Sequence, residues 1–267
     1  MLLVFVGSGA TAAFWMIMHH YVLKSDERKT DVIDEAYRRK VFQVLAATYN
    51  EEIIRGERWL GITRMRKNLL ARARGQVLEL AAGTGTNFAY YDPKKVDYLC
   101  AVDLSPNMIT EAKRDAAALR VSELAVGNAE DLSQFADATF DTVVDTFGMC
   151  SYEHPERALA EMKRVVKEDG SILLLQHGMC RRTYKWMLRI LNNNAERHAE
   201  NYGCWWNRDV PKLVHEAGLD MPYFRMRHFR TTFFIVAKKP KNKKQLAAAD
   251  DVTPGIAADH ATADKHS

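Results

Sequence analysis

A glycine-rich turn between two predicted strands is the feature of this 267-residue chain that most restricts its fold. Apolar residues over 77–80 lead into Ala81-Ala82-Gly83-Thr84-Gly85, and a second apolar run ends at Asp103. Glycines let the backbone approach a ligand where a Cβ would collide, and an acid about 20 residues further on can accept both hydroxyls of a ribose. The pattern predicts an α/β domain whose first turn, leading onto a helix, holds a nucleoside.

The residues around this turn distinguish between two kinds of nucleoside ligand. A dinucleotide site requires a small residue three positions after Gly85, where helix and strand are in contact, and this chain has Phe88 there. Glu79 would place a carboxylate near the phosphates of a dinucleotide, but it suits a ligand that carries an ammonium group and a sulfonium. S-adenosylmethionine has both groups, and we therefore expect it as the cofactor.

Strand and helix patterns alternate along the following residues. Strands are predicted over 124–126, 140–146 and 172–175, with an amphipathic helix over 155–166 and a Glu-Asp-Gly turn at 168–170. This order predicts a doubly wound, Rossmann-like α/β sheet with parallel strands and helices on both faces. Ligands of such sheets bind at the carboxyl ends of the strands.

From residue 40 to 237 the chain resembles the class I S-adenosylmethionine-dependent methyltransferases, in the UbiE-like, type 11 subgroup that includes quinone methyltransferases and membrane-anchored thiol methyltransferases. Three segments look most like the OMS-type mitochondrial inner-membrane methyltransferases of fungi, namely 145–152, 173–178 and 203–207. The resemblance implies one domain, closed by an antiparallel pair of strands over 223–228 and 232–236.

Two positions depart from the pattern of this family. Ala81 stands where the family has the first glycine of its loop, and Asn128 stands where many members carry Asp. A methyl group at position 81 is tolerable if the backbone keeps a negative φ, and the amide of Asn128 still offers a donor and an acceptor. We therefore expect cofactor binding to persist.

The resemblance also implies which residues contact the cofactor. The turn would face the methionine moiety, Asp103 the ribose, and Asp145 the sulfonium, while Leu104 and Met108 would enclose the adenine. The full set of expected contacts is Tyr49, Glu79, Ala81, Gly83, Gly85, Asp103, Leu104, Met108, Asn128, Ala129, Glu130 and Asp145.

Several of these residues allow a second interpretation. Asp103 could instead cap a helix before Ser105, and Glu130 could be a solvated acid. A helix is predicted over 42–50, and the resemblance places it over the cofactor. Tyr49 in this helix could lay its ring against the sulfonium, a contact worth about 0.5 to 2 kcal/mol, or it could serve helix packing alone.

Catalytic residues are harder to recognise, because methyl transfer depends mainly on alignment and exclusion of water. His177, directly after the predicted strand over 172–175, is the best-placed candidate base; alternatively it caps the strand or lines the pocket. Cys150 and Tyr152 follow the preceding strand and could be either pocket wall or participants. The four cysteines, Cys100, Cys150, Cys180 and Cys204, show no paired metal spacing, so neither a metal site nor a disulfide framework is expected.

The two ends of the chain differ from its centre. Residues 2–23 contain no Lys, Arg, Asp or Glu and, as a helix, could cross a hydrocarbon core of about 30 Å, so we expect a transmembrane anchor over 1–23 and a linker over 24–40. The methyltransferase domain would span 41–237, and residues 238–267 would form a disordered tail. An insertion over 179–208, rich in Arg, Asn and aromatic residues, is interpreted as a substrate lid or as an amphipathic segment covering its own core.

A net charge of +4 argues neither for nor against nucleic acid. We expect a membrane-anchored methyltransferase that acts on a small or lipid-soluble acceptor such as a quinol, a phenol or a thiol. The alternative is a methyltransferase-fold assembly or scaffold factor of a mitochondrial membrane or ribosomal complex. DNA is not an expected partner, whereas an RNA or protein substrate stays open. The resemblance points to the mitochondrial inner membrane, with the endoplasmic reticulum as the alternative.

Overall fold

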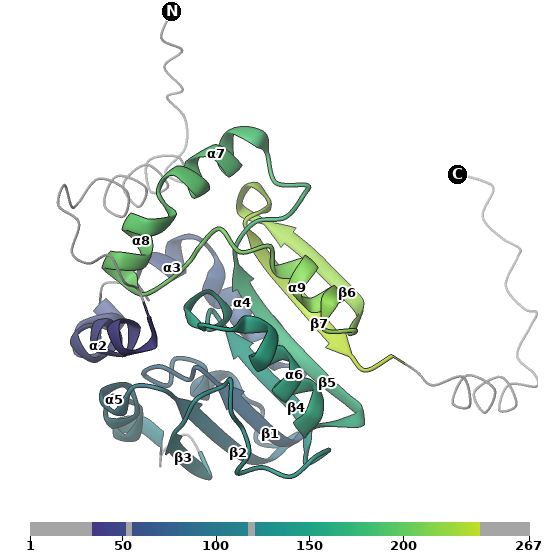
Figure 1. Ribbon diagram of the computed structural model, residues 1–267. Coiled ribbons are helices and arrows are strands. Elements are labelled where there is room, and N and C mark those ends of the chain that lie inside the picture. Colours follow the sequence, from purple (N-terminus) through teal and green to yellow (C-terminus); the bar gives the residue numbers. More distant parts are fainter. Residues whose placement is uncertain (1–33, 52–54, 117–120, 241–267) are drawn as a thin grey trace, which may run out of the picture.

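The computed structural model describes residues 34–51, 55–116 and 121–240, which build one sheet with helices on both faces (Figure 1). The sheet has seven strands in the order β3-β2-β1-β4-β5-β7-β6. Neighbours from β3 to β5 are parallel, and β7 is antiparallel to β5 and to β6. The strands are β1 Gly75–Leu80, β2 Val96–Asp103, β3 Glu123–Val126, β4 Phe140–Thr146, β5 Val166–His177, β6 Asp220–Arg227 and β7 Thr232–Lys238. The predicted doubly wound sheet and its closing antiparallel pair are confirmed.

The helices begin where the sequence provides starting signals. The Asp34 carboxylate accepts a hydrogen bond from the Tyr37 N–H at 2.8 Å and caps α2, while Pro155 occupies the first turn of α6. The helices are α2 Glu35–Leu45, α3 Arg55–Trp59, α4 Ile62–Leu70, α5 Pro106–Ala116, α6 Pro155–Val165, α7 Lys185–Asn193, α8 Ala195–Tyr202 and α9 Val210–Glu216. The described residues also form the short 3-10 helices η2 Phe88–Tyr90, η3 Met149–Ser151 and η4 His228–Arg230.

Alternation of side chains along the central strands produces two hydrophobic cores. Leu78 and Leu80 of β1 pack in one core with residues of α6 and α9, whereas Val77 packs in the other with residues of α4 and α5. Complete burial of one such side chain contributes roughly 1.5 to 3 kcal/mol to stability. The two cores hold β1 and β4 rigidly, and with them the strand ends that form the site.

The segment after the glycine-rich turn differs from the prediction. Gly83 and Gly85 have φ of +57° and +81°, and only the short η2 follows where an α-helix was expected. The backbone N–H groups of Gly85 and Phe88 each donate to the carbonyl three residues earlier, at 3.0 Å, so the chain forms successive turns. A Cβ on Gly85 would lie 2.5 Å from the Phe88 ring, which occupies the space beside the turn. The predicted helix is wrong for this reason.

The predicted turn over 168–170 is also wrong, because these residues belong to β5. Phe140 pairs with Val166 and Thr142 pairs with Ser171, so the extra residues of β5 form an irregularity within one strand. A Cβ on Gly170 would lie 2.7 Å from a Val166 methyl carbon and 3.0 Å from the Asp141 carbonyl oxygen. A glycine is therefore needed where the strand bends back against β4.

The expected anchor over 1–23, most of the expected linker and the tail from 241 lie outside the described residues. Within the described ranges, the structure contains no helix with the length and apolar character required to span a bilayer. Helix α2 begins at Glu35, inside the region expected as linker, and Figure 1 places it beside α5 and α8.

Candidate functional site

A pocket opens at the carboxyl ends of β1, β2 and β4, where the strand order of the sheet reverses. It encloses about 720 Å³, part of which is open to solvent. Its lining residues are Glu35, Arg38, Phe42, Tyr49, Ala81, Gly83, Asp103, Leu104, Met108, Gly127, Asn128, Ala129, Glu130, Thr146, Phe147, Gly148, Ser151 and Tyr152. The structure thus brings nine of the twelve expected cofactor contacts to one cavity, and the exceptions are Glu79, Gly85 and Asp145.

The parts of the pocket are named after the cofactor groups that the sequence assigns to them: ribose, methionine and adenine. The part assigned to the ribose is organised by Asp103. One carboxylate oxygen of Asp103 accepts from the Gly83 N–H and the other from the Ser105 N–H, each at 2.8 Å. Burial raises the pKa of Asp103, while these two hydrogen bonds oppose the shift. The Ser105 side chain accepts from the Met108 N–H in the first turn of α5. Ser105 therefore caps this helix, in place of Asp103 as the alternative interpretation had it. The remaining lone pairs of Asp103 can accept ribose hydroxyls.

The turn beneath the methionine end is tightly constrained. A Cβ on Gly83 would meet no atom within 4 Å, so this glycine leaves open space on the pocket side. Ala81 has φ +48°, so the negative φ expected at this departure from the family pattern is not found. A Cβ on Gly148 would lie 2.5 Å from the Ala81 Cβ and 2.6 Å from the Tyr152 hydroxyl oxygen. The Ala81 methyl group therefore packs directly against the Gly148 backbone, where there is no room for a Cβ on residue 148.

Glu79 and Asp145 are buried and are not lining residues. The Glu79 carboxylate accepts from the Asn87 side-chain amide at 3.0 Å and from the Tyr91 hydroxyl at 2.7 Å. Burial raises the pKa of Glu79 to about 7 and that of Asp145 to about 7. Asp145 accepts from the Gly148 N–H at 2.9 Å through one oxygen, and its other oxygen has no hydrogen-bond partner among the described residues. Their expected contacts with the methionine moiety and sulfonium stay predictions.

The adenine end is closed by the loop after β3. The Asn128 side chain accepts from the Glu130 N–H at 2.9 Å and donates to Glu35 of α2 at 3.0 Å. Glu130 accepts from the backbone N–H groups of Glu153 and His154, at 2.6 and 3.0 Å. The loop between η3 and α6 therefore fixes the Glu130 carboxylate in place. The alternative interpretation of Glu130 as a freely solvated acid does not describe this arrangement.

The sequence predicted a helix over 42–50 above the cofactor, but it missed the earlier start of α2 and the pocket residues Glu35 and Arg38. Glu35, Arg38 and Phe42 line the pocket, and Arg38, only 2% exposed, donates to Glu153 at 3.1 Å. The signal in the sequence was the cap at Asp34 followed by side chains three and four residues apart. Tyr49, which the sequence did assign to the pocket, follows this helix and lines the same cavity.

A buried ion pair supports the pocket from the opposite side. Arg66 of α4 donates to both carboxylate oxygens of Glu57, at 2.7 and 2.8 Å. Its other nitrogen donates to Asn87 at 3.0 Å and to Thr146 at 2.7 Å. The guanidinium also lies 4.9 Å from the centre of the Phe147 ring. This one side chain thus connects the glycine-rich turn with the end of β4.

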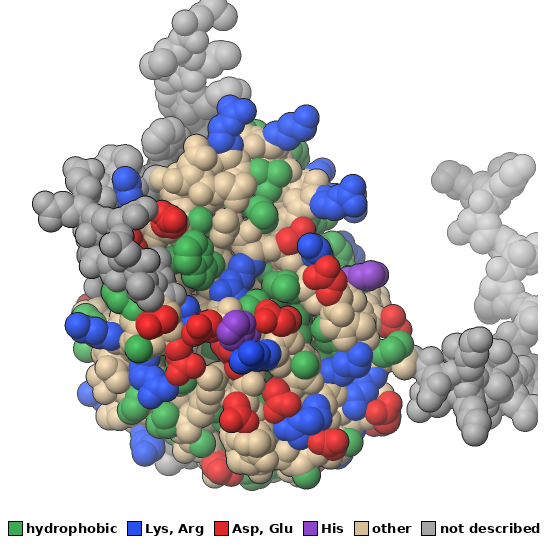
Figure 2. Space-filling model, in the orientation of Figure 1, with side chains coloured by type: hydrophobic (Ala, Val, Ile, Leu, Met, Phe, Trp, Pro, Cys, Tyr) green, Lys and Arg blue, Asp and Glu red, His purple; other side chains and the backbone are tan. Residues whose placement is uncertain are grey.

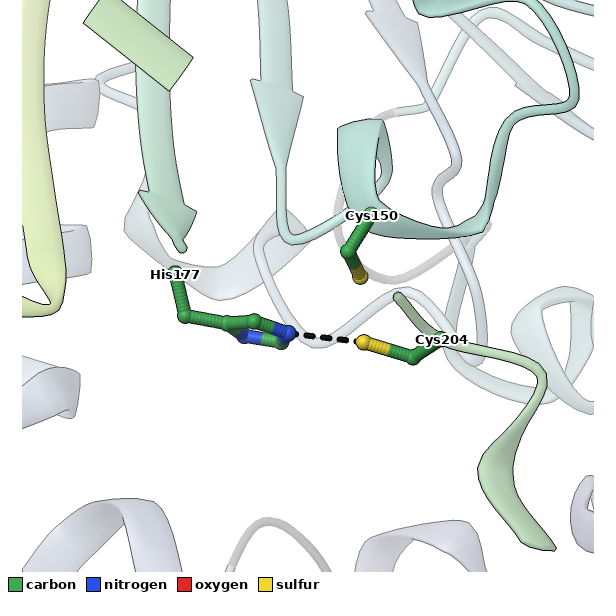
Figure 3. A group of neighbouring side chains, drawn as sticks. All are labelled: Cys150, His177 and Cys204. Carbon is green, nitrogen blue, oxygen red and sulfur yellow. Dashed lines mark hydrogen bonds between the residues drawn. The ribbon is translucent and has the colours of Figure 1, made fainter. Parts of the chain in front are cut away.

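Three side chains from distant segments meet beside the pocket (Figure 3). Cys150 comes from η3, His177 from the end of β5, and Cys204 from the insertion, directly after α8. The imidazole Nε2 lies 2.8 Å from the Cys204 sulfur, and the ligand atoms of all three residues lie within 4.8 Å of one another. We call these residues the thiol–imidazole cluster. Because the three positions are far apart in sequence, no local spacing could have predicted it.

Electrostatics within the thiol–imidazole cluster favour a single thiolate. Burial opposes ionisation, but the hydrogen bond with Cys204 and the charge of His177 hold the pKa of Cys150 well below its usual value. Burial and the nearby Cys150 raise the pKa of Cys204 well above the usual value of a cysteine, since two adjacent thiolates repel each other. Burial lowers the pKa of His177, but the charge of Cys150 outweighs it and the net shift is upward.

His177 does not line the pocket, and Phe147 lies between the two. The Phe147 ring stacks on the imidazole with ring centres 5.4 Å apart, and Phe147 itself lines the cavity. The insertion over 179–208 contributes no lining residue. Its helix α7 buries Met187 and Leu191 but leaves Trp186 48% exposed. Only some of the apolar side chains of this helix therefore pack against the core.

The fold and the pocket together define a class: a doubly wound α/β protein with an adenosine-type pocket at the switch point of its sheet and a terminal antiparallel pair. Residues 78–174 match the model of the family described as "Methyltransferase domain". The chain carries a class I S-adenosylmethionine-dependent methyltransferase domain, and S-adenosylmethionine is the cofactor of that class.

Curated relatives agree with this assignment. The chain is 34% identical over 221 residues to the yeast (Saccharomyces cerevisiae) protein "Methyltransferase OMS1, mitochondrial", an alignment that covers 76% of this chain and 46% of the relative. It is 34% identical over 116 residues to the human (Homo sapiens) "Thiol S-methyltransferase TMT1B", covering 40% of this chain and 46% of the relative. The chain thus spans about half the length of the curated relatives it matches.

The fold is shared with solved structures at low sequence identity. An O-methyltransferase family protein from Burkholderia thailandensis superposes with a TM-score of 0.60 at 18% identity, covering 87% of this chain and 71% of that structure. At this identity the likeness concerns the fold.

Proposed function

We propose that the protein transfers the methyl group of S-adenosylmethionine to a small or lipid-soluble acceptor, with a thiol as the first class to test. The observation that carries the proposal is the pocket at the switch point, where the Asp103 carboxylate and the Gly83 backbone are held together at 2.8 Å. The pocket has an acidic residue for the ribose and apolar residues, Leu104 and Met108, for the adenine.

The acceptor class is proposed from the surroundings of the pocket and from the relatives. Phe147, Ser151 and Tyr152 form the side of the pocket nearest to η3, and none of them brings a fixed charge. An uncharged wall that includes the aromatic rings of Phe147 and Tyr152 suits a lipid-soluble acceptor. The human relative is named as a thiol S-methyltransferase, which supports testing thiols before quinols and phenols.

The location is proposed from the sequence and from one relative. Residues 2–23 supply an apolar segment of transmembrane length, and the yeast relative is named as mitochondrial. We therefore propose a membrane-anchored protein of the mitochondrial inner membrane, with the endoplasmic reticulum as the alternative.

The test is calorimetric titration of the full-length chain, purified in detergent, with S-adenosylmethionine. Asp103→Asn should weaken binding at least about tenfold, since hydrogen bonds to a charged group contribute roughly 1.5 to 3 kcal/mol. Asp97→Asn is the matched control, because Asp97 is an exposed carboxylate on the same strand. An acceptor screen with thiols, quinols and phenols then follows the formation of S-adenosylhomocysteine. A folded wild-type chain without saturable binding would support the scaffold alternative instead.

A further inference from the structure

The thiol–imidazole cluster is not explained by the donor pocket. None of its three residues lines that cavity, and a methyl-donor site requires neither cysteine. Cys150 and Cys204 are 2% and 6% exposed, and both sulfurs and the imidazole Nε2 converge on one interior space (Figure 3).

The residue types and their spacing fit a tetrahedral metal ion. Two thiolates and one imidazole are ligands that Zn²⁺ prefers, with bonds of about 2.3 Å to sulfur and about 2.0 Å to nitrogen. In a tetrahedral site these bonds place the ligand atoms roughly 3.5 to 3.8 Å apart. The atoms here lie within 4.8 Å of one another. The 2.8 Å approach of His177 to Cys204 would have to widen by about 0.7 Å, and the largest separation in the cluster would have to shorten by up to about 1 Å.

The surroundings hold the cluster in place. The Cys204 segment is fixed by a hydrogen bond from the Trp205 N–H to the Cys150 carbonyl at 2.9 Å. Arg208 donates to the Met149 carbonyl at 3.1 Å and to that of Tyr152, so a positive charge lies next to the turn that carries Cys150. A fixed cation nearby balances part of the charge of the thiolates, and second-shell contacts of this kind orient metal ligands.

Two simpler explanations account for only part of the arrangement. A hydrogen bond between His177 and Cys204 does not involve Cys150, whose thiol donates to the Phe147 carbonyl at 3.4 Å. A disulfide between the cysteines does not involve His177, which stacks on Phe147. A metal site uses all three side chains.

We propose that Cys150, His177 and Cys204 bind one Zn²⁺ ion, leaving one coordination position for a thiolate or a water molecule. Binding of the ion releases to solvent the protons that the cluster carries, so that two thiolates and a neutral imidazole face the metal. Three protein ligands with a fourth, exchangeable position are the pattern of reactive zinc sites. The exchangeable ligand fits the thiol class proposed above, and to that extent the inference rests on the proposed function.

The experiment measures the zinc content of the full-length chain by mass spectrometry, after purification in detergent without chelators and with added Zn²⁺. We expect about one equivalent for the wild type and at least a tenfold loss of affinity in Cys150→Ser, Cys204→Ser and His177→Gln. The matched control is Cys180→Ser, because Cys180 is equally buried but bonds to Thr183 outside the cluster, and it should retain the metal. Zinc below about 0.1 equivalent, or zinc retained by the ligand variants, overturns the proposal.

A second measurement does not depend on the variants folding. Titration of the wild type with Co²⁺ should give the intense visible absorption of a tetrahedral ion and thiolate-to-cobalt charge-transfer bands, and a small thiol such as 2-mercaptoethanol should shift them. Octahedral Co²⁺ absorption overturns the metal site. A disulfide between Cys150 and Cys204 that persists in protein purified under reducing conditions overturns it as well. Tetrahedral spectra that do not respond to thiol overturn the exchangeable position. S-adenosylmethionine titration of the same samples reports the donor site separately, so failure of one proposal is distinguished from failure of the other.

Discussion

Single residues at the pocket carry backbone strain. Ala81 and Phe147 have φ of +48° and +60°, a region that residues with a Cβ rarely adopt, and both line the cavity. The left-handed conformation costs roughly 1 to 2 kcal/mol for such a residue. Strain of this kind is concentrated at sites where neighbouring structure determines the backbone, here where Gly148 approaches Ala81 and where Phe147 stacks on His177.

Replacing Ala81 with glycine should stabilise the protein. Relief of about 1 to 2 kcal/mol of strain exceeds the roughly 0.4 to 1 kcal/mol lost through a more flexible unfolded chain, so we expect a net gain of about 1 kcal/mol in the free energy of unfolding. Urea denaturation measures the change. Ala138→Gly is the control, because Ala138 also has a positive φ, +50°, and lies on the surface away from the pocket. A loss of stability in Ala81→Gly alongside a gain in Ala138→Gly contradicts the prediction.

The buried carboxyl group of Asp145 should make stability depend on pH. Its folded-state pKa of about 7 lies above the ordinary value of 3.8, so between these values the folded state binds the extra proton. The free energy of unfolding should therefore fall as pH rises from about 4 to about 7, with up to about 4 kcal/mol involved. Denaturation of Asp145→Asn at pH 5 and pH 8 should show a smaller fall than the wild type. Equal pH dependence in both proteins rules this out.

At the scale of elements, α4 and the loop after β1 act as one unit through Arg66. The guanidinium is 4% exposed and spans Glu57, Asn87 and Thr146, so it fixes the position of α3, the glycine-rich turn and the end of β4 together. The pair with Glu57 compensates a charge that would otherwise be costly to bury.

Breaking this pair should be strongly destabilising. Glu57→Gln leaves the Arg66 charge buried without its carboxylate, and we expect a loss of about 3 to 5 kcal/mol. Thermal and urea denaturation check this value. Glu216→Gln serves as the control, since Glu216 forms an exposed pair with Lys212 at 3.6 Å and its loss should change stability by less than about 1 kcal/mol. Similar losses in the two variants would count against the role of Arg66.

Most elements were predictable from the sequence because their signals are local. The apolar runs of β1, β2, β4 and β5 and the periodicity of α6 are read within a few residues of each other. The helix expected after Gly85 was wrong, because the packing of Phe88 against that glycine depends on the tertiary core. Three features could not be predicted for the same reason, because each joins residues that only the fold brings together: the pocket contacts of Glu35 and Arg38, the Arg66 network and the thiol–imidazole cluster.

At the scale of the whole molecule, the pocket lies between α2 and the sheet, and α2 is the first described element after the proposed anchor. The face in Figure 2 shows positive side chains over the end that carries α7 and a mixture of both signs elsewhere. A nucleic-acid backbone binds to continuous positive charge, and most of this face does not present it.

Deleting residues 2–23 should release the protein from membranes without removing the donor site. The segment supplies the apolar length required to span a bilayer, whereas all pocket residues lie after residue 34. Carbonate extraction of expressing cells should move the shortened chain to the supernatant, and its affinity for S-adenosylmethionine should stay within about twofold. Deletion of 241–267 is the control and should leave the protein in the pellet. Retention of the chain without residues 2–23 would place the membrane contact elsewhere.

Glu130 has two tasks in the structure. Its carboxylate lines the pocket and also accepts from the backbone N–H groups of Glu153 and His154. Replacing Glu130 with an apolar residue would therefore remove the acceptor of both N–H groups and free the loop that follows η3. Evolutionary change at this pocket position is thus restricted by the backbone behind it as well as by the ligand in front of it.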